Sequence, residues 1–178
     1  MRRTETLRQI KLFQSLDAAA IAALDTQCAW RRCPAEQWLI DYQDESNDVF
    51  FVVSVAAQVR IESAGRTVLL RELRAGEYFG ALAAIDGRSR SAGILAVTGV
   101  VTARMPASVF RTAVHAHSDV CDQLLGLLVG QIRMLANRVY EFSTLDVRCR
   151  LYAELLRLSR PSDQHNGRLI ISPPPLLM

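Results

Sequence analysis

A regular apolar repeat late in the chain limits the possible folds more than any other feature. Seven residues follow one another at steps of 4, 3, 4, 3, 4 and 3: Cys121, Leu125, Leu128, Ile132, Leu135, Val139 and Phe142. An apolar repeat of about 3.5 residues is typical of a helix that packs against another helix. We therefore predict one long helix over residues 118–143 whose repeat, called the seam from here on, packs on a second copy of the chain in a homodimer. Because Leu124 and Leu127 widen the apolar surface, part of the helix should pack on its own domain, and docking of the whole helix there is the alternative.

The end of the seam predicts a hinge. Asp146 stands where the repeat requires an apolar residue, and a second helix with its own apolar positions is expected from about Leu145 onward. The hinge is therefore placed near Ser143 and Thr144. Further on, residues 169–171 are strand-like, and a single strand cannot bury its face alone. This segment is interpreted as the opening of a further domain that the chain does not contain.

The middle of the chain alternates short apolar runs with polar or glycine-containing breaks. The runs are typical of β-strands and lie at residues 38–40, 49–53, 59–61, 68–70, 94–97 and 100–103. The last two, separated by Gly99, are interpreted as a strand pair, and Gly65 is expected in a hairpin turn because glycine supplies the positive φ of such turns. Two short helices are expected within residues 7–30, the second capped by Ser15 or Asp17. Short strands at close spacing predict an antiparallel roll or barrel.

The composition excludes several classes of protein. With 178 residues, 50% of them apolar and 22% charged, the chain suits one globular domain with a small appendage rather than a disordered protein. No apolar run approaches the roughly 20 residues of a membrane-spanning helix, and the N-terminus lacks the apolar core of a signal peptide. We therefore expect a cytoplasmic protein without a membrane partner. The net charge of +3 is too small to indicate nucleic-acid binding by itself.

The reactive side chains do not predict an enzyme or a metal centre. The four cysteines, with no CxxC pair, are Cys28, Cys33, Cys121 and Cys149. They are interpreted as reduced structural thiols, and an iron–sulfur, haem or other redox sensor is the alternative. His115 and His117 are expected in an exposed loop. No nucleophile, base and orienting acid occur at a recognisable spacing.

The most chemically suggestive segment is YFGALAAIDGRSRSAG, residues 78–93. Gly80 permits close backbone approach, and the helix-forming run after it, residues 81–85, would present free N–H groups at its first turn. Arg90 and Ser91 add a guanidinium and a hydroxyl after the turn at Gly87. These residue types suit a cradle for one phosphodiester charge. The alternative is that the arginines only face solvent.

The order of these motifs resembles the Crp/Fnr family of bacterial cyclic-nucleotide-responsive regulators. The resemblance covers about residues 10–172 and is carried by GRTVLLRELRAGEYFG (65–80), DGRSRSA (86–92), the long helix and LDVRCRL (145–151). It implies an α+β fold with an antiparallel β-roll (a double-stranded β-helix, jelly-roll-like), flanked by short helices and followed by a long C-terminal dimerisation helix.

The implied domains are three. They are the N-terminal helices with a cyclic nucleotide-binding roll (1–117), the dimerisation helix (118–144), and a hinge, second helix and the start of a winged helix-turn-helix domain (145–178). DNA would be bound only through that further domain, which the chain is expected to lack.

The resemblance also assigns site residues. Gly80, Arg90, Ser91 and Ala92 match the family's phosphate-binding cassette, so that Arg90 would pair with the phosphate of cAMP or cGMP and Ser91 would hydrogen-bond it. The remaining ligand-binding positions implied are Leu70, Ala81, Leu82, Leu135, Ala136 and Asn137.

Three of these positions depart from the family's pattern. Ala81 stands where a Glu usually contacts the ribose 2′-hydroxyl, and Leu135 and Ala136 stand where a Thr or Ser pair contacts the purine. Asn137 has the right chemistry but lies about 100° round the helix from Ala136. Two hypotheses result. One is a cyclic nucleotide sensor that re-orients its dimer helices to control DNA binding. The other is a ligand-independent dimerisation scaffold.

Overall fold

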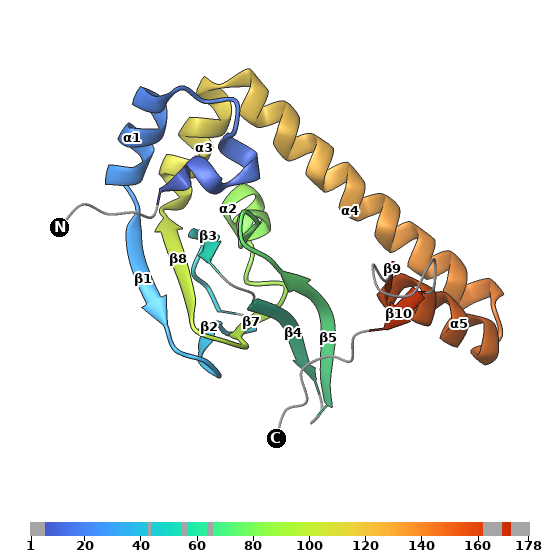
Figure 1. The fold of residues 1–178 in the computed structure, drawn as a ribbon. Helices are drawn as coiled ribbons and strands as arrows, with labels where there is room; N and C mark the ends of the chain where they lie inside the picture. Colours follow the sequence, from blue (N-terminus) through green and yellow to red (C-terminus); the bar gives the residue numbers. More distant parts are fainter. Residues whose placement is uncertain (1–5, 43, 55–56, 64–65, 162–168, 172–178) are drawn as a thin grey trace. The chain divides into compact units, whose positions relative to one another are not determined.

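The computed structural model describes residues 6–42, 44–54, 57–63, 66–161 and 169–171, without the side chains of residues 57–63, 66–72, 158, 160–161 and 169–171. The chain divides into two compact units, residues 1–125 and 126–178. The first unit holds the two four-stranded sheets and the short helices before residue 118, and the second holds the later part of the long helix together with the C-terminal elements (Figure 1).

Short helices open the first unit. They are η1 (Leu7–Gln9), η2 (Lys11–Phe13) and α1 (Ala18–Thr26). Of the two predicted caps, Ser15 and Asp17, it is Asp17 that caps α1, since its Oδ1 accepts a hydrogen bond from the N–H of Ala20 at 2.7 Å.

Eight strands form two antiparallel sheets of four, which confirms the predicted β-roll. The first sheet has the order β1-β8-β3-β6, with bounds Ala29–Cys33, Val100–Met105, Val49–Ser54 and Tyr78–Phe79. The second sheet has the order β2-β7-β4-β5, with bounds Trp38–Ile40, Gly93–Ala96, Ala57–Ser63 and Arg66–Leu73. β4 and β5 pair from Ala57↔Leu73 to Ser63↔Arg66, as a hairpin requires. The expected turn residue Gly65 lies outside the described residues.

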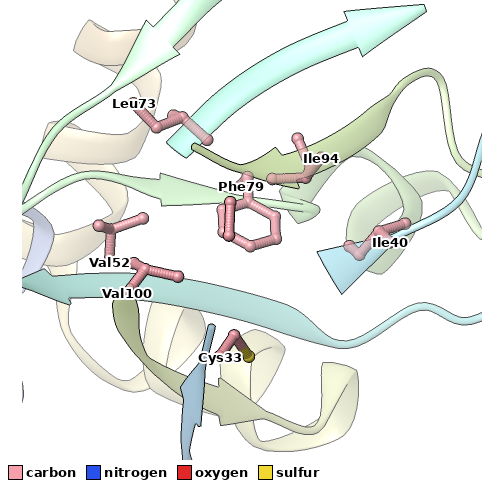
Figure 2. Close-up of a cluster of buried hydrophobic side chains, with 8 residues drawn as sticks. Cys33, Ile40, Val52, Leu73, Phe79, Ile94 and Val100 are labelled. Atoms are coloured by element: carbon pink, nitrogen blue, oxygen red, sulfur yellow. The ribbon is translucent and has the colours of Figure 1, made fainter. Parts of the chain in front are cut away.

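The two sheets are joined by a buried apolar cluster (Figure 2). The first sheet contributes Cys33, Val52, Phe79 and Val100, and the second contributes Ile40, Leu73, Ile94 and Ala96. Because the side chains of a strand alternate between its two faces, Phe51 faces away from this cluster. Its ring lies 5.1 Å from that of Phe13 between centroids, which ties the N-terminal helices to the other face of the first sheet.

The predicted pairing of residues 94–97 with 100–103 is wrong. β7 pairs with β2 and β4, whereas β8 pairs with β1 and β3. The chain crosses from one sheet to the other at Gly99, so that the two strands face each other across the core instead of sharing hydrogen bonds. β1 was not predicted because its sequence, AWRRC, is half polar, and β6 because it has two residues.

Four α-helices follow or interrupt the sheets: α2 (Ala81–Asp86), α3 (Ala107–Ala116), α4 (Ser118–Thr144) and α5 (Val147–Leu158). α4 is the predicted long helix. The predicted hinge residues, Ser143 and Thr144, are the last two residues of α4, and the helix breaks just after them, at residues 145–146. Asp146 caps α5 by accepting from the N–H of Cys149 at 2.7 Å. His115 lies on α3 and His117 is its C-terminal cap, so the expectation of a loop was wrong. No helix in the described ranges is long and apolar enough to cross a membrane.

Ion pairs join α4 to α5 within the second unit. Arg157 Nη2 lies 2.7 Å from Glu141 Oε2, and Arg138 Nη2 lies 3.8 Å from Glu154 Oε1. The strand expected at residues 169–171 is β10 (Leu169–Ile171), but it is not single as expected. It pairs antiparallel with β9 (Ser159–Pro161).

Candidate functional site

Gly80 is the point where strand β6 becomes helix α2, and it tolerates no side chain. Its φ of +85° is a left-handed conformation that residues with a Cβ rarely adopt. A Cβ at this position would lie 2.5 Å from Arg90 Nη1 and 2.7 Å from the carbonyl oxygen of Asp48. The close approach predicted at Gly80 is therefore real, and the group that approaches is the guanidinium of Arg90.

Arg90 is buried, with 3% of its surface exposed. Nη1 donates to the carbonyl of Gly80 at 3.0 Å, and Nη2 donates to the carbonyl of Asp48 at 2.8 Å. Nε and Nη2 both donate to Ser46 Oγ, at 3.2 and 3.0 Å. These bonds use four of the five N–H groups that a guanidinium carries. The ring of Phe50 lies 5.9 Å from the guanidinium carbon.

The electrostatics of the site centre on this cation. Burial lowers the pKa of the Arg90 guanidinium, and the charges of Asp44 and Asp48 oppose that fall. Asp48 also forms an ion pair with Arg104 on β8. The pKa of Asp44 is lowered, first by hydrogen bonds from Ser46 and then by the charge of Arg90. A buried cation held beside a helix start is a group that can receive an anion.

Comparisons with known proteins agree with this geometry. The cyclic nucleotide-binding domain family matches residues 30–117. The cAMP-activated global transcriptional regulator CRP of Salmonella typhimurium is 25% identical over 141 residues, 78% of this chain and 67% of that protein. A CRP-like cAMP-activated global transcriptional regulator of Mycobacterium tuberculosis is 25% identical over 170 residues, 94% of this chain and 76% of that protein.

Residues 30–117 form a cyclic nucleotide-binding domain, and the chain is homologous to CRP-like regulators. Among solved structures, the catabolite activator protein of Thermus thermophilus matches with a TM-score of 0.68 and 22% identity, over 83% of this chain and 70% of that one. This likeness confirms the α+β fold with its antiparallel β-roll and long helix.

The cyclic nucleotide-binding domain brings only some of the predicted site residues together. Gly80 and Arg90 are in contact, and Ala81 is buried at the first position of α2. Ser91 is exposed, and Ala92 packs against the apolar cluster. Leu82, the remaining predicted ligand-binding residue of this domain whose side chain is described, is half exposed at 51%.

The remaining predicted site residues lie elsewhere. Leu70 lies on β5, and its side chain is outside the described part of the chain. Leu135, Ala136 and Asn137 are exposed residues of α4 in the second unit. Their part in a ligand site stays a prediction.

The two arginines of the segment differ. Arg88 is exposed and lies 3.9 Å from Asp86 between Nε and Oδ2, so the solvent-facing alternative describes Arg88. Arg90 is the buried one. Ser46 and Asp48 were not predicted as site residues, and their only signal in the sequence is the polar run DESND at residues 44–48, directly before β3.

The cysteines do not gather in one place. Cys28 and Cys33 are buried, Cys121 is half-buried, and Cys149 is exposed on α5, where a buried structural thiol was expected. Burial raises the pKa of the Cys33 thiol. Within the part of the chain that the structure describes, no three His, Cys, Asp or Glu residues are placed to hold a metal ion.

Gly80→Ala should destabilise the domain more than Gly87→Ala. Both glycines have positive φ, +85° and +70°, but a Cβ at Gly87 meets no described atom within 4 Å. The control substitution should lower the free energy of unfolding by about 1–2 kcal/mol, and Gly80→Ala by about 1–3 kcal/mol more because Arg90 and the chain at Asp48 must shift. Urea denaturation of both variants measures the difference. Equal losses would contradict the close packing of Arg90 on Gly80.

Proposed function

We propose that the roll binds cAMP, with the cyclic phosphate held by Arg90 and Ser91 at the start of α2. The observation that carries the proposal is the burial of a guanidinium against the glycine that begins this helix. A buried cation stabilises an anion more than an exposed one does, because water screens it less. The matching relatives are named for cAMP activation, which favours cAMP over cGMP as the ligand.

The departures from the family's pattern set the expected strength of binding. Ala81 is buried and has no polar atom in its side chain, so it offers the ribose no hydrogen bond. One missing charge-assisted hydrogen bond weakens affinity by roughly one to two powers of ten. We therefore expect cAMP to bind this chain about ten- to a hundredfold more weakly than it would bind with a Glu at position 81.

We further propose that α4 forms the interface of a homodimer. Its seam residues in the second unit are exposed, with Ile132 at 65%, Val139 at 65% and Phe142 at 67% of their surface. Apolar side chains at heptad spacing are stabilised by a facing helix. Ligand binding would shift how two α4 helices lie against each other and re-aim the segment beyond the break at residues 145–146. In this scheme 1–117 senses, 118–144 dimerises, and 145–178 passes the signal to a DNA-binding domain.

A ligand-independent dimerisation scaffold is the second candidate. It is favoured by the hydrogen bonds of Arg90, whose guanidinium is already satisfied by Ser46, Gly80 and Asp48. Leu135 and Ala136 also offer a base no hydrogen-bonding side chain. In this alternative Arg90 is a structural residue, and cAMP does not bind.

Ser91→Ala should weaken cAMP binding about tenfold, because it removes one hydrogen bond to a charged group. Ser91 is exposed, so the substitution leaves the fold intact. Ser89→Ala, at an exposed serine two residues earlier, is the matched control and should bind as the parent does. Isothermal titration calorimetry with cAMP and, separately, cGMP measures all three proteins. An absence of binding by the parent chain would favour the scaffold.

Ile132→Glu should dissociate the proposed homodimer. A carboxylate at this seam position would be buried in the interface without a partner, which weakens self-association by at least about tenfold. Arg133→Glu places the same side chain one position away, off the seam, and should leave association unchanged. Sedimentation-velocity ultracentrifugation of the three proteins over a concentration series gives the comparison. A monomeric parent chain would contradict the proposed interface.

A further inference from the structure

We propose that Ser46 is a built-in competitor for the ligand: its hydroxyl occupies the edge of the Arg90 guanidinium that a phosphate needs, and a phosphate binds by displacing residues 44–46. This inference rests on the proposed function, because it names how the same site is opened. It concerns a loop residue between β2 and β3, more than 40 positions from Arg90 in the sequence.

The guanidinium has two edges that can each bind two oxygens of one anion. The edge formed by Nη1 and Nη2 is closed by the carbonyls of Gly80 and Asp48. Gly80 O also accepts the N–H of Ala84 in the first turn of α2, at 3.3 Å, and Asp48 directly precedes β3. Neither carbonyl can leave without disturbing a helix or a strand.

The other edge, formed by Nε and Nη2, is held by a group that can leave. Both nitrogens donate to the single oxygen of Ser46. Ser46 is exposed and lies in a loop, so its displacement breaks no ladder of backbone hydrogen bonds. Two phosphate oxygens would take the two N–H groups separately, with better geometry and full opposite charge. The exchange of one hydroxyl for one phosphate therefore favours the ligand.

Repulsion between the Asp44 carboxylate and a bound phosphate also favours movement of the loop that holds Ser46. Asp44 acts on Arg90 through its charge, and its carbonyl accepts the N–H of Arg90 at 2.9 Å. Its carboxylate also accepts the N–H of Ser46 at 2.5 Å, so Asp44 and Ser46 form one local unit. A phosphate on the Nε edge would be repelled by this carboxylate. Asp48 differs, because its carboxylate is neutralised by Arg104.

Ser46→Ala should tighten cAMP binding by about five- to tenfold, since the ligand no longer displaces a hydroxyl from a charged group. Ser46→Thr keeps the hydroxyl and should restore the parent affinity, which a merely structural effect of the substitution would not do. Ser89→Ala is the control for removing a serine hydroxyl from an exposed loop. Calorimetry with cAMP gives the affinities.

Hydrogen exchange supplies a readout that does not depend on a variant. The amide of Arg90, which donates to the carbonyl of Asp44, should lose protection when cAMP binds the parent chain, because residues 44–46 leave Arg90.

The outcomes separate the inference from the proposed function. Equal or weaker cAMP binding by Ser46→Ala, with binding by the parent chain, overturns the inference and leaves the function standing. Binding by Ser46→Ala alone supports the inference and shows that the parent site is held shut. No binding by either protein rejects both.

Discussion

A guanidinium cannot be buried without acceptors, and the arrangement of this site results from supplying them to Arg90. The carbonyl of Gly80 can reach Nη1 only because Gly80 has no Cβ, and the carbonyl of Asp48 is brought near by the start of β3. Ser46 supplies the third acceptor from a surface loop. Two segments distant in sequence, residues 44–48 and 80–90, are thus held together around one cation, and the cation is placed at the first turn of α2.

The parts of the fold that depend on local pattern could be predicted. The seam gave α4 nearly to its observed ends, and an aspartate cap marked the start of α1. Strand pairing could not be predicted in the same way. β7 and β8 are joined by a short break at Gly99, and such a break fits both a hairpin and a crossing between the two sheets of a roll. β1 was not predicted because two consecutive polar residues, Arg31 and Arg32, interrupt the alternation of apolar and polar side chains that is typical of a strand.

The site residues also differ in how far they could be predicted, according to their distance from Arg90 in the sequence. Gly80 and Arg90 lie within one segment and were predicted as parts of one phosphate cradle, although their direct contact was not predicted. Ser46 and Asp48 are 44 and 42 residues from Arg90 and reach it only through the pairing of the roll. The cation could therefore be predicted from the sequence, but its partners could not. Those partners decide whether Arg90 is a ligand-binding group, a structural residue, or one that changes from the second role to the first.

The central claim is that the Nε edge of Arg90 is where a cyclic phosphate binds, and a crystal structure of the chain with cAMP tests it most directly. The account predicts two phosphate oxygens within hydrogen-bond distance of Nε and Nη2, with Ser46 Oγ displaced and the bonds to the carbonyls of Gly80 and Asp48 retained. A phosphate bound elsewhere, with Ser46 still on Arg90, would contradict it.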